Sequence, residues 1–85
     1  MTRDHIQKEI LGIFARQFEI ENPGLDEDLR DAYEFDSIDA IDLLREIEMM
    51  FNAELTRDEK ERAMDIRTIN QIIDYVAELA AGRTA

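Results

Sequence analysis

The sequence contains no cysteine and no tryptophan, and basic residues are scarce. Without cysteine the chain can form no disulfide bond, use no thiolate nucleophile and bind no metal through sulfur. Its 85 residues include 10 Lys and Arg against 21 Asp and Glu, which gives a formal net charge of −11. This balance argues against binding to nucleic acid or to anionic membranes, because both interactions need clusters of basic side chains.

Long hydrophobic runs are also missing, and none approaches the roughly 18 residues that a membrane-spanning helix needs. Residues 1–10 are too charged for a signal peptide. We therefore expect a cytoplasmic protein that does not insert into membranes. Hydrophobic residues make up 45% of the chain, which is too many for a typical acidic disordered segment. We expect residues 1–85 to form one small domain, and this domain to be a monomer.

Apolar residues recur at steps of three and four in three segments, which is the spacing of amphipathic helices. Opposite charges three and four residues apart predict a fourth, short helix. No segment alternates as a strand would, so we predict an all-α fold, a small four-helix bundle with a long loop between the first and second helices. The expected helices cover residues 3–18, 36–52, 56–64 and 68–81, and Gly82 is expected to end the last one.

The second helix begins with the run Asp36-Ser37-Ile38-Asp39. Asp36 suits the N-cap and Asp39 the third helical position, so their carboxylates predict a capping box. We expect Ile38 and Ile41 to face the core and Ser37 to point away from it. The only histidine, His5, lies on another helix, so Ser37 has no general base for catalysis. A phosphate ester at this position would meet free backbone N–H groups and a favourable helix dipole.

This run, with the apolar residues that follow it, resembles the second helix of acyl carrier proteins, whose signature is Asp-Ser-Leu followed by an acidic residue. Residues 69–76 resemble the last helix of that family. The length, the acidity, the missing cysteine and the helix order are similar as well. The resemblance therefore covers essentially the whole chain.

The resemblance implies that Ser37 carries 4′-phosphopantetheine, transferred from coenzyme A by holo-acyl-carrier-protein synthase or another phosphopantetheinyl transferase. The thiol of this arm would carry acyl groups as thioesters for fatty acid, polyketide or specialised lipid biosynthesis. Asp36 would cap the helix and help the modifying enzyme to dock. The protein itself would be a carrier without catalytic activity.

An acidic face on the second helix would meet Arg and Lys patches on acyl-transferring, ligating or condensing enzymes. Such contacts favour fast association and easy release over tight binding. The aliphatic core also raises the hypothesis that the bundle opens to shelter an acyl chain. The expected partner-binding residues are Asp39, Asp42, Glu46 and Glu48.

Several residues depart from the family pattern and favour a specialised carrier over a housekeeping one. Tyr33-Glu34-Phe35 replaces the usual Leu-Gly and the residue after it, and Arg45, Met49 and Met50 are unusual on the second helix. Two alternatives stay open, a carrier of aminoacyl or aryl groups and an unmodified acidic helical adaptor that binds basic proteins. The acidic residues 26–31 lack the glycine of an EF-hand loop, so no metal site is expected.

Overall fold

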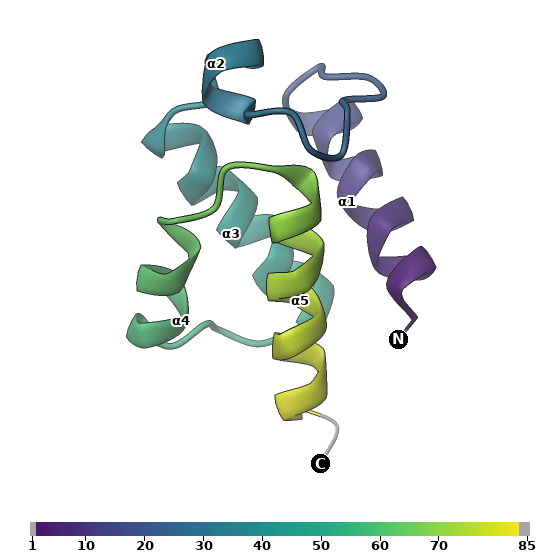
Figure 1. Ribbon diagram of the computed structural model, residues 1–85. Coiled ribbons are helices and arrows are strands. Elements are labelled where there is room, and N and C mark those ends of the chain that lie inside the picture. Colours follow the sequence, from purple (N-terminus) through teal and green to yellow (C-terminus); the bar gives the residue numbers. More distant parts are fainter. Residues whose placement is uncertain (1, 84–85) are drawn as a thin grey trace.

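The computed structural model describes residues 2–83, with side chains through residue 82, and all regular structure in this range is helical. The expected all-helical bundle is confirmed (Figure 1). The long loop of the sequence prediction contains one additional short helix, α2. The elements are α1 (Arg3–Gln17), α2 (Leu29–Tyr33), α3 (Ser37–Phe51), α4 (Arg57–Ala63) and α5 (Ile69–Arg83).

Short polar side chains fix where the helices begin. The Thr2 hydroxyl accepts a hydrogen bond from the backbone N–H of His5 at 3.2 Å at the start of α1. At the start of α4, the Thr56 hydroxyl accepts from the N–H of Glu59, whose carboxylate accepts from the N–H of Thr56 at 2.8 Å. Each N-cap contributes about 0.5–2 kcal/mol. The prediction that Gly82 ends the last helix was wrong, because α5 continues through Gly82 to Arg83.

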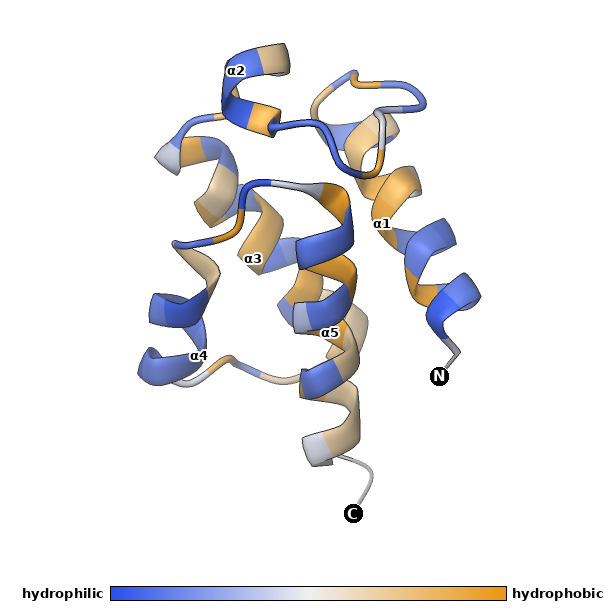
Figure 2. Ribbon diagram, in the orientation of Figure 1, coloured by the Kyte–Doolittle hydropathy of each residue, from blue (hydrophilic) through white to orange (hydrophobic). Residues whose placement is uncertain are grey.

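The core lies between α1, α3 and α5, whose inner faces are hydrophobic (Figure 2). α1 packs against α5, and α3 contacts α4. Each fully buried large aliphatic side chain contributes about 1.5–3 kcal/mol. The largest fully buried side chains are Phe14, Ile6, Ile10, Leu29, Ile47, Ile69, Ile72, Ile73 and Val76.

One prediction about the core was wrong: Ile38 and Ile41 are 68% and 48% exposed. A helix turns by about 100° per residue, so Ile38 and Ile47, nine residues apart, lie on opposite faces of α3. Successive steps of three residues drift around the helix and do not form one stripe. The inner face of α3 is made by Leu43, Leu44 and Ile47.

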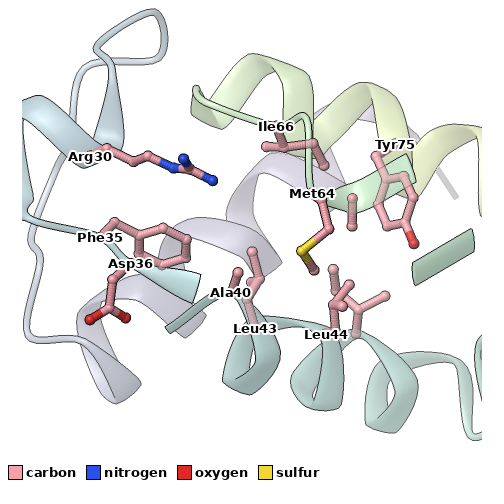
Figure 3. A pocket seen from close by; sticks show the side chains of 11 residues that line it. Arg30, Phe35, Asp36, Ala40, Leu43, Leu44, Met64, Ile66 and Tyr75 are labelled. Carbon is pink, nitrogen blue, oxygen red and sulfur yellow. The ribbon is translucent and has the colours of Figure 1, made fainter. Parts of the chain in front are cut away.

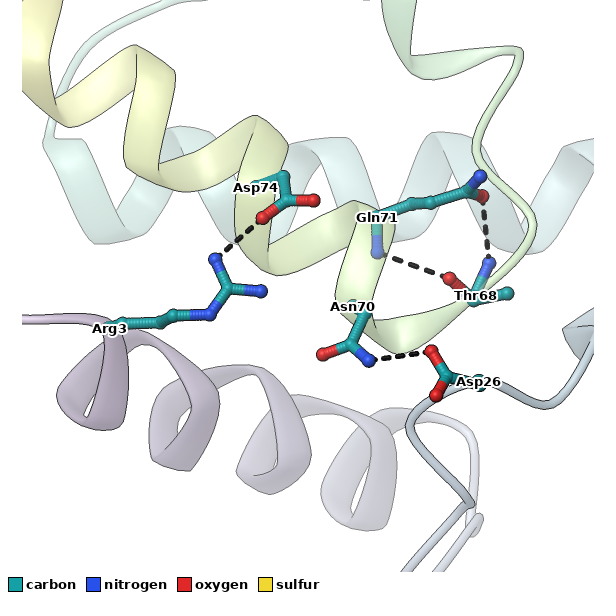
Figure 4. A network of polar contacts seen from close by, with 6 residues as sticks. All are labelled: Arg3, Asp26, Thr68, Asn70, Gln71 and Asp74. Carbon is teal, nitrogen blue, oxygen red and sulfur yellow. Dashed lines mark hydrogen bonds and ion pairs between the residues drawn. The ribbon is translucent and has the colours of Figure 1, made fainter.

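Polar contacts hold the segment before α2 against α5 (Figure 4). The Asn70 side-chain amide donates to the Asp26 carboxylate at 2.7 Å, and the Asn70 N–H donates to the Leu25 carbonyl at 2.9 Å. Nearby, Arg3 of α1 forms an ion pair with Asp74 of α5 at 2.6 Å. α2 is therefore carried on a segment that is attached to α5, which places it beside the N-terminal end of α3 (Figure 1).

The same segment has an internal hydrogen-bonded group. The Glu27 carboxylate accepts from the Tyr33 hydroxyl at 2.7 Å and from the Gly24 N–H at 2.6 Å. These two hydrogen bonds lower the pKa of Glu27, because they favour the ionised carboxylate, and the bond from Tyr33 has the larger effect. The bond to Glu27 raises the pKa of Tyr33.

Across residues 2–83, no helix is both long enough and apolar enough to cross a lipid bilayer.

Candidate functional site

The start of α3 is fixed by the capping box that the sequence predicted. One carboxylate oxygen of Asp36 accepts from the backbone N–H groups of Ile38 and Asp39, both at 3.0 Å. The Asp39 carboxylate accepts in return from the N–H of Asp36 at 3.2 Å. Because Asp36 is the N-cap, Ser37 occupies the first position of the helix, and its side chain is exposed.

The turn before Ser37 is held in a strained conformation. Glu34 ends α2 with φ 55°, in the left-handed region. A non-glycine residue there costs about 1–2 kcal/mol. The N–H of Glu34 donates to the Arg30 carbonyl at 3.1 Å, and the N–H of Phe35 donates to the Leu29 carbonyl at 3.2 Å. These bonds turn the chain out of α2 and into α3 over three residues, Glu34 to Asp36.

Phe35 attaches this turn to α1. Its ring is buried, stacks on Phe14 with a centroid distance of 5.5 Å, and meets Phe18 edge-on at 5.3 Å. Phe14 and Phe18 are themselves 5.2 Å apart. Each aromatic pair contributes about 0.5–1.5 kcal/mol beyond burial. The residue two positions before Ser37 is therefore an anchor, which explains why this chain can place an aromatic side chain there.

An open hollow of about 430 Å³ lies in front of Ser37. Its lining contains two carboxylates and one guanidinium, and no imidazole or thiol. The imidazole that most often activates a serine is absent from this lining, and the Asp36 carboxylate is engaged in capping α3. The lining residues are Arg30, Glu34, Phe35, Asp36 and Ser37.

A second, narrow crevice begins at the same place and runs between α3 and the segment from α4 to α5 (Figure 3). Its volume is about 20 Å³, which is room for about one water molecule. Most of the lining is apolar, and Arg30 and Asp36 lie at the end next to Ser37. The apolar lining is formed by Phe35, Ala40, Leu43, Leu44, Ile47, Ala63, Met64, Ile66 and Tyr75.

The four acidic residues expected to meet partners have different surroundings. Asp42 is exposed. The Glu46 carboxylate pairs with Arg16 of α1 at 3.0 Å, and its side chain is only 13% exposed. The Glu48 carboxylate accepts from the N–H of Leu55 at 2.8 Å. With Asp39 in the capping box, three of the four carboxylates have partners inside the molecule.

The outer face of α3 also carries hydrophobic side chains, two of which, Ile38 and Ile41, were expected to face the core. Ile38, Ile41 and Met49 are exposed, whereas Met50 is partly buried against the core. Arg45 is exposed too. The spacing of 38, 41, 45 and 49 was the available signal, because these positions share one face of a helix.

The fold and the serine at the tip of α3 define a class of small helical carrier domains. Residues 8–76 match the family model described as phosphopantetheine attachment site. Acyl carrier protein 2 of Pseudomonas aeruginosa is 31% identical over 77 residues, covering 88% of this chain and 94% of that protein. An acyl carrier protein of Rubrobacter xylanophilus is 30% identical over 80 residues, covering 92% and 95%. One of Lactobacillus johnsonii is 27% identical over 78 residues, covering 89% and 94%.

The chain therefore belongs to the acyl carrier protein family, whose members carry covalently attached 4′-phosphopantetheine. Carriers of this family are generally not catalysts themselves, and they interact with phosphopantetheinyl transferases and with acyl-handling enzymes.

Proposed function

We propose that Ser37 is the attachment point of the prosthetic group and that the protein carries acyl intermediates. The observation that carries this proposal is that Ser37 is the only serine in the chain. It is also exposed at the first position of a capped helix, directly after Asp36. A transferase can reach its hydroxyl without unfolding any part of the bundle.

The residues around Ser37 fit the group. The hollow in front of the hydroxyl is open, and the Arg30 guanidinium in its lining supplies positive charge for a phosphodiester. When bound, the prosthetic group supplies a thiol that holds an acyl group as a thioester. Asp36 positions Ser37 by capping α3. Because the chain has no cysteine, that thiol is the only one in the loaded protein.

We further propose that the crevice shelters the aliphatic part of the acyl group. Its lining is apolar and one end lies next to Ser37. At about 20 Å³ it holds about one water, so α4 and the segment after it must move outward to admit a chain. We expect NMR shifts of Leu44, Ile47 and Ile66 that grow with acyl chain length. Shifts independent of chain length would contradict the shelter.

Partner enzymes are proposed to approach the exposed end of α3. Asp42 is the most accessible of the four expected docking acids, since the other three have internal partners. Basic patches on enzymes of fatty acid, polyketide or specialised lipid biosynthesis would meet Asp42 first. The carboxylates of Asp39, Glu46 and Glu48 would add to the negative electrostatic potential around it.

The decisive experiment is intact-mass measurement after incubation with coenzyme A and a promiscuous phosphopantetheinyl transferase. The wild-type chain should gain one phosphopantetheinyl group, and Ser37→Ala should gain none. Thr56→Ala is the matched control, because it removes a different hydroxyl at a helix start and should still be loaded. If the protein is an unmodified adaptor, neither the wild type nor either variant will gain mass. Subsequent loading by acyl ligases, compared with aminoacyl ligases, separates an acyl carrier from an aminoacyl or aryl carrier.

A further inference from the structure

Arg30 is shared by the two hollows that meet at the attachment site. It lines the open hollow in front of Ser37, and it also lines the mouth of the narrow crevice. Among the residues that line either one, Arg30 alone is basic. Figure 3 shows its guanidinium extending from α2 toward the space between Phe35 and Ile66. One cation is therefore placed where the two hollows join.

The charge around Ser37 explains why a cation matters there. Glu34 and Asp36 line the same hollow, and Asp39 lies two residues after Ser37, in the capping box of the first turn. A phosphodiester on Ser37 adds a further negative charge among these carboxylates. An arginine presents five N–H donors in a planar fork that fits phosphate oxygens in a bidentate way. Arg30 is the side chain of this lining that offsets the added charge.

Arg30 is also available for this contact. Four other arginines form ion pairs with carboxylates, namely Arg3, Arg16, Arg57 and Arg62. In the part of the chain that the structure describes, no ion pair involves Arg30, and its side chain is exposed. The backbone N–H of Arg30 donates to the Asp28 carboxylate at 2.9 Å. This N-cap of α2 involves only the backbone of Arg30, so it does not depend on what the guanidinium binds.

We propose that Arg30 binds the phosphodiester on Ser37 and so directs the prosthetic arm across the mouth of the crevice. The proposal rests on the proposed function, because it needs the arm at Ser37. A guanidinium bound on the crevice side holds the first part of the arm over Phe35 and toward Met64 and Ile66. A partner that competes for this phosphate, or salt that screens the pair, releases the arm to solvent.

The missing cysteine makes the arm easy to follow. In the loaded protein the arm carries the only thiol, so a nitroxide maleimide labels it alone. Paramagnetic broadening of the Met64 and Ile66 amide signals then reports how often the arm lies across the crevice. We expect clear broadening in the wild type. Arg30→Gln should reduce it about two- to fivefold, the range that an exposed ion pair allows, and Arg30→Lys should give an intermediate value.

Arg57→Gln is the matched control, since it removes the same charge from an exposed arginine of α4 outside both hollows. It should leave the broadening unchanged. As a second readout, the side-chain N–H signal of Arg30 should shift when the apo protein is loaded, and that of Arg57 should not. Circular dichroism of each variant checks that the bundle is folded.

The outcomes separate the two proposals. If Ser37 gains no mass, the proposed function is overturned and the role of Arg30 falls with it. If Ser37 is loaded but Arg30→Gln and Arg57→Gln give the same broadening, only the role of Arg30 is overturned. A wild-type arm that leaves Met64 and Ile66 unbroadened contradicts it as well.

Discussion

The contact between α1 and α5 differs from the contact between α3 and the α4 side of the bundle. Where α1 meets α5, apolar side chains are fully buried, Ile10 and Ile72 among them, and Arg3 pairs with Asp74 across the edge. Where α3 faces α4, the lining includes the small Ala40 and Ala63 and a narrow crevice remains. The α1–α5 side of the bundle is closed, whereas the α3–α4 side keeps a crevice although Leu43, Leu44 and Ile47 also line it.

α4 is held mainly by polar contacts, which include an ion pair between Arg62 of α4 and Glu78 of α5 at 3.5 Å. Of its seven residues, only Ala63 is buried. The Tyr75 hydroxyl of α5 donates to the Glu59 carbonyl at 2.6 Å. Just before α4, the N–H of Leu55 donates to the Glu48 carboxylate of α3. Apolar burial is thus concentrated on the α1–α5 side. We therefore expect the bundle to open first at α4 while α1 and α5 stay together, because local stability follows buried apolar contacts.

The largest effect should come from a cavity on the closed side. We expect Ile10→Ala to lower the free energy of unfolding by about 2–5 kcal/mol, the usual cost of a buried Ile→Ala change. A domain of this size has about 4–13 kcal/mol in total. Ile66→Ala, at a partly exposed position of the crevice, should cost about 1 kcal/mol, because less apolar area is lost. Urea denaturation measures both, and equal losses would contradict the comparison.

Local features of this fold could be predicted from the sequence. The capping box of Asp36 and Asp39 joins groups within three residues, and its chemistry is visible in the residue types. The same holds for the limits of α3, which begins at Ser37 and ends at Phe51, each within one residue of the expected position. The position of Ser37 in the first turn of α3 follows from this cap, whereas its proposed role as the attachment serine follows from the resemblance to the family.

Features that depend on distant residues could not be predicted. Glu46 meets Arg16 from a position thirty residues earlier, so its loss of exposure is not visible in α3 alone. The exposure of Ile38 and Ile41 is a different case, because the spacing in the sequence already separates Ile38 from Ile47 by half a turn of the helix. Arg30 was missed as well, because α2 had no apolar period to place it.

The next effect concerns α4. We expect Tyr75→Phe to lower stability by about 1–3 kcal/mol, since it removes the donor of a partly buried carbonyl. Hydrogen exchange should accelerate first at the amides of α4 and later, or not at all, at those of α1 and α5. Tyr33→Phe is the matched control, because the Tyr33 hydroxyl bonds to an exposed carboxylate. Uniform acceleration across the molecule would show that α4 does not open separately.

A smaller effect should follow from the ion pair at the edge of the closed side. Arg3 and Asp74 are both more than half exposed, and exposed pairs contribute about 0–1 kcal/mol. Asp74→Asn should therefore change the urea midpoint much less than Ile10→Ala does. Added salt should stabilise both forms, because it screens the repulsion of a chain with net charge −11. A loss as large as that of Ile10→Ala would mean that charge, and not burial, closes this side.

The smallest effect concerns the pKa of Glu27, which lies in the segment before α2 and outside the contact between α1 and α5. Its pKa is lowered chiefly by the Tyr33 hydroxyl and then by the Gly24 N–H. A lowered pKa means that the ionised carboxylate favours the folded state above its unfolded pKa, and that this contribution is lost as the pH falls through the folded value. Tyr33→Phe removes the larger cause, so the pKa of Glu27 should rise toward its ordinary value while the Gly24 bond keeps it below. Carboxyl NMR titration of both forms measures the shift, and an unchanged pKa would show that the hydroxyl does not favour the ionised form.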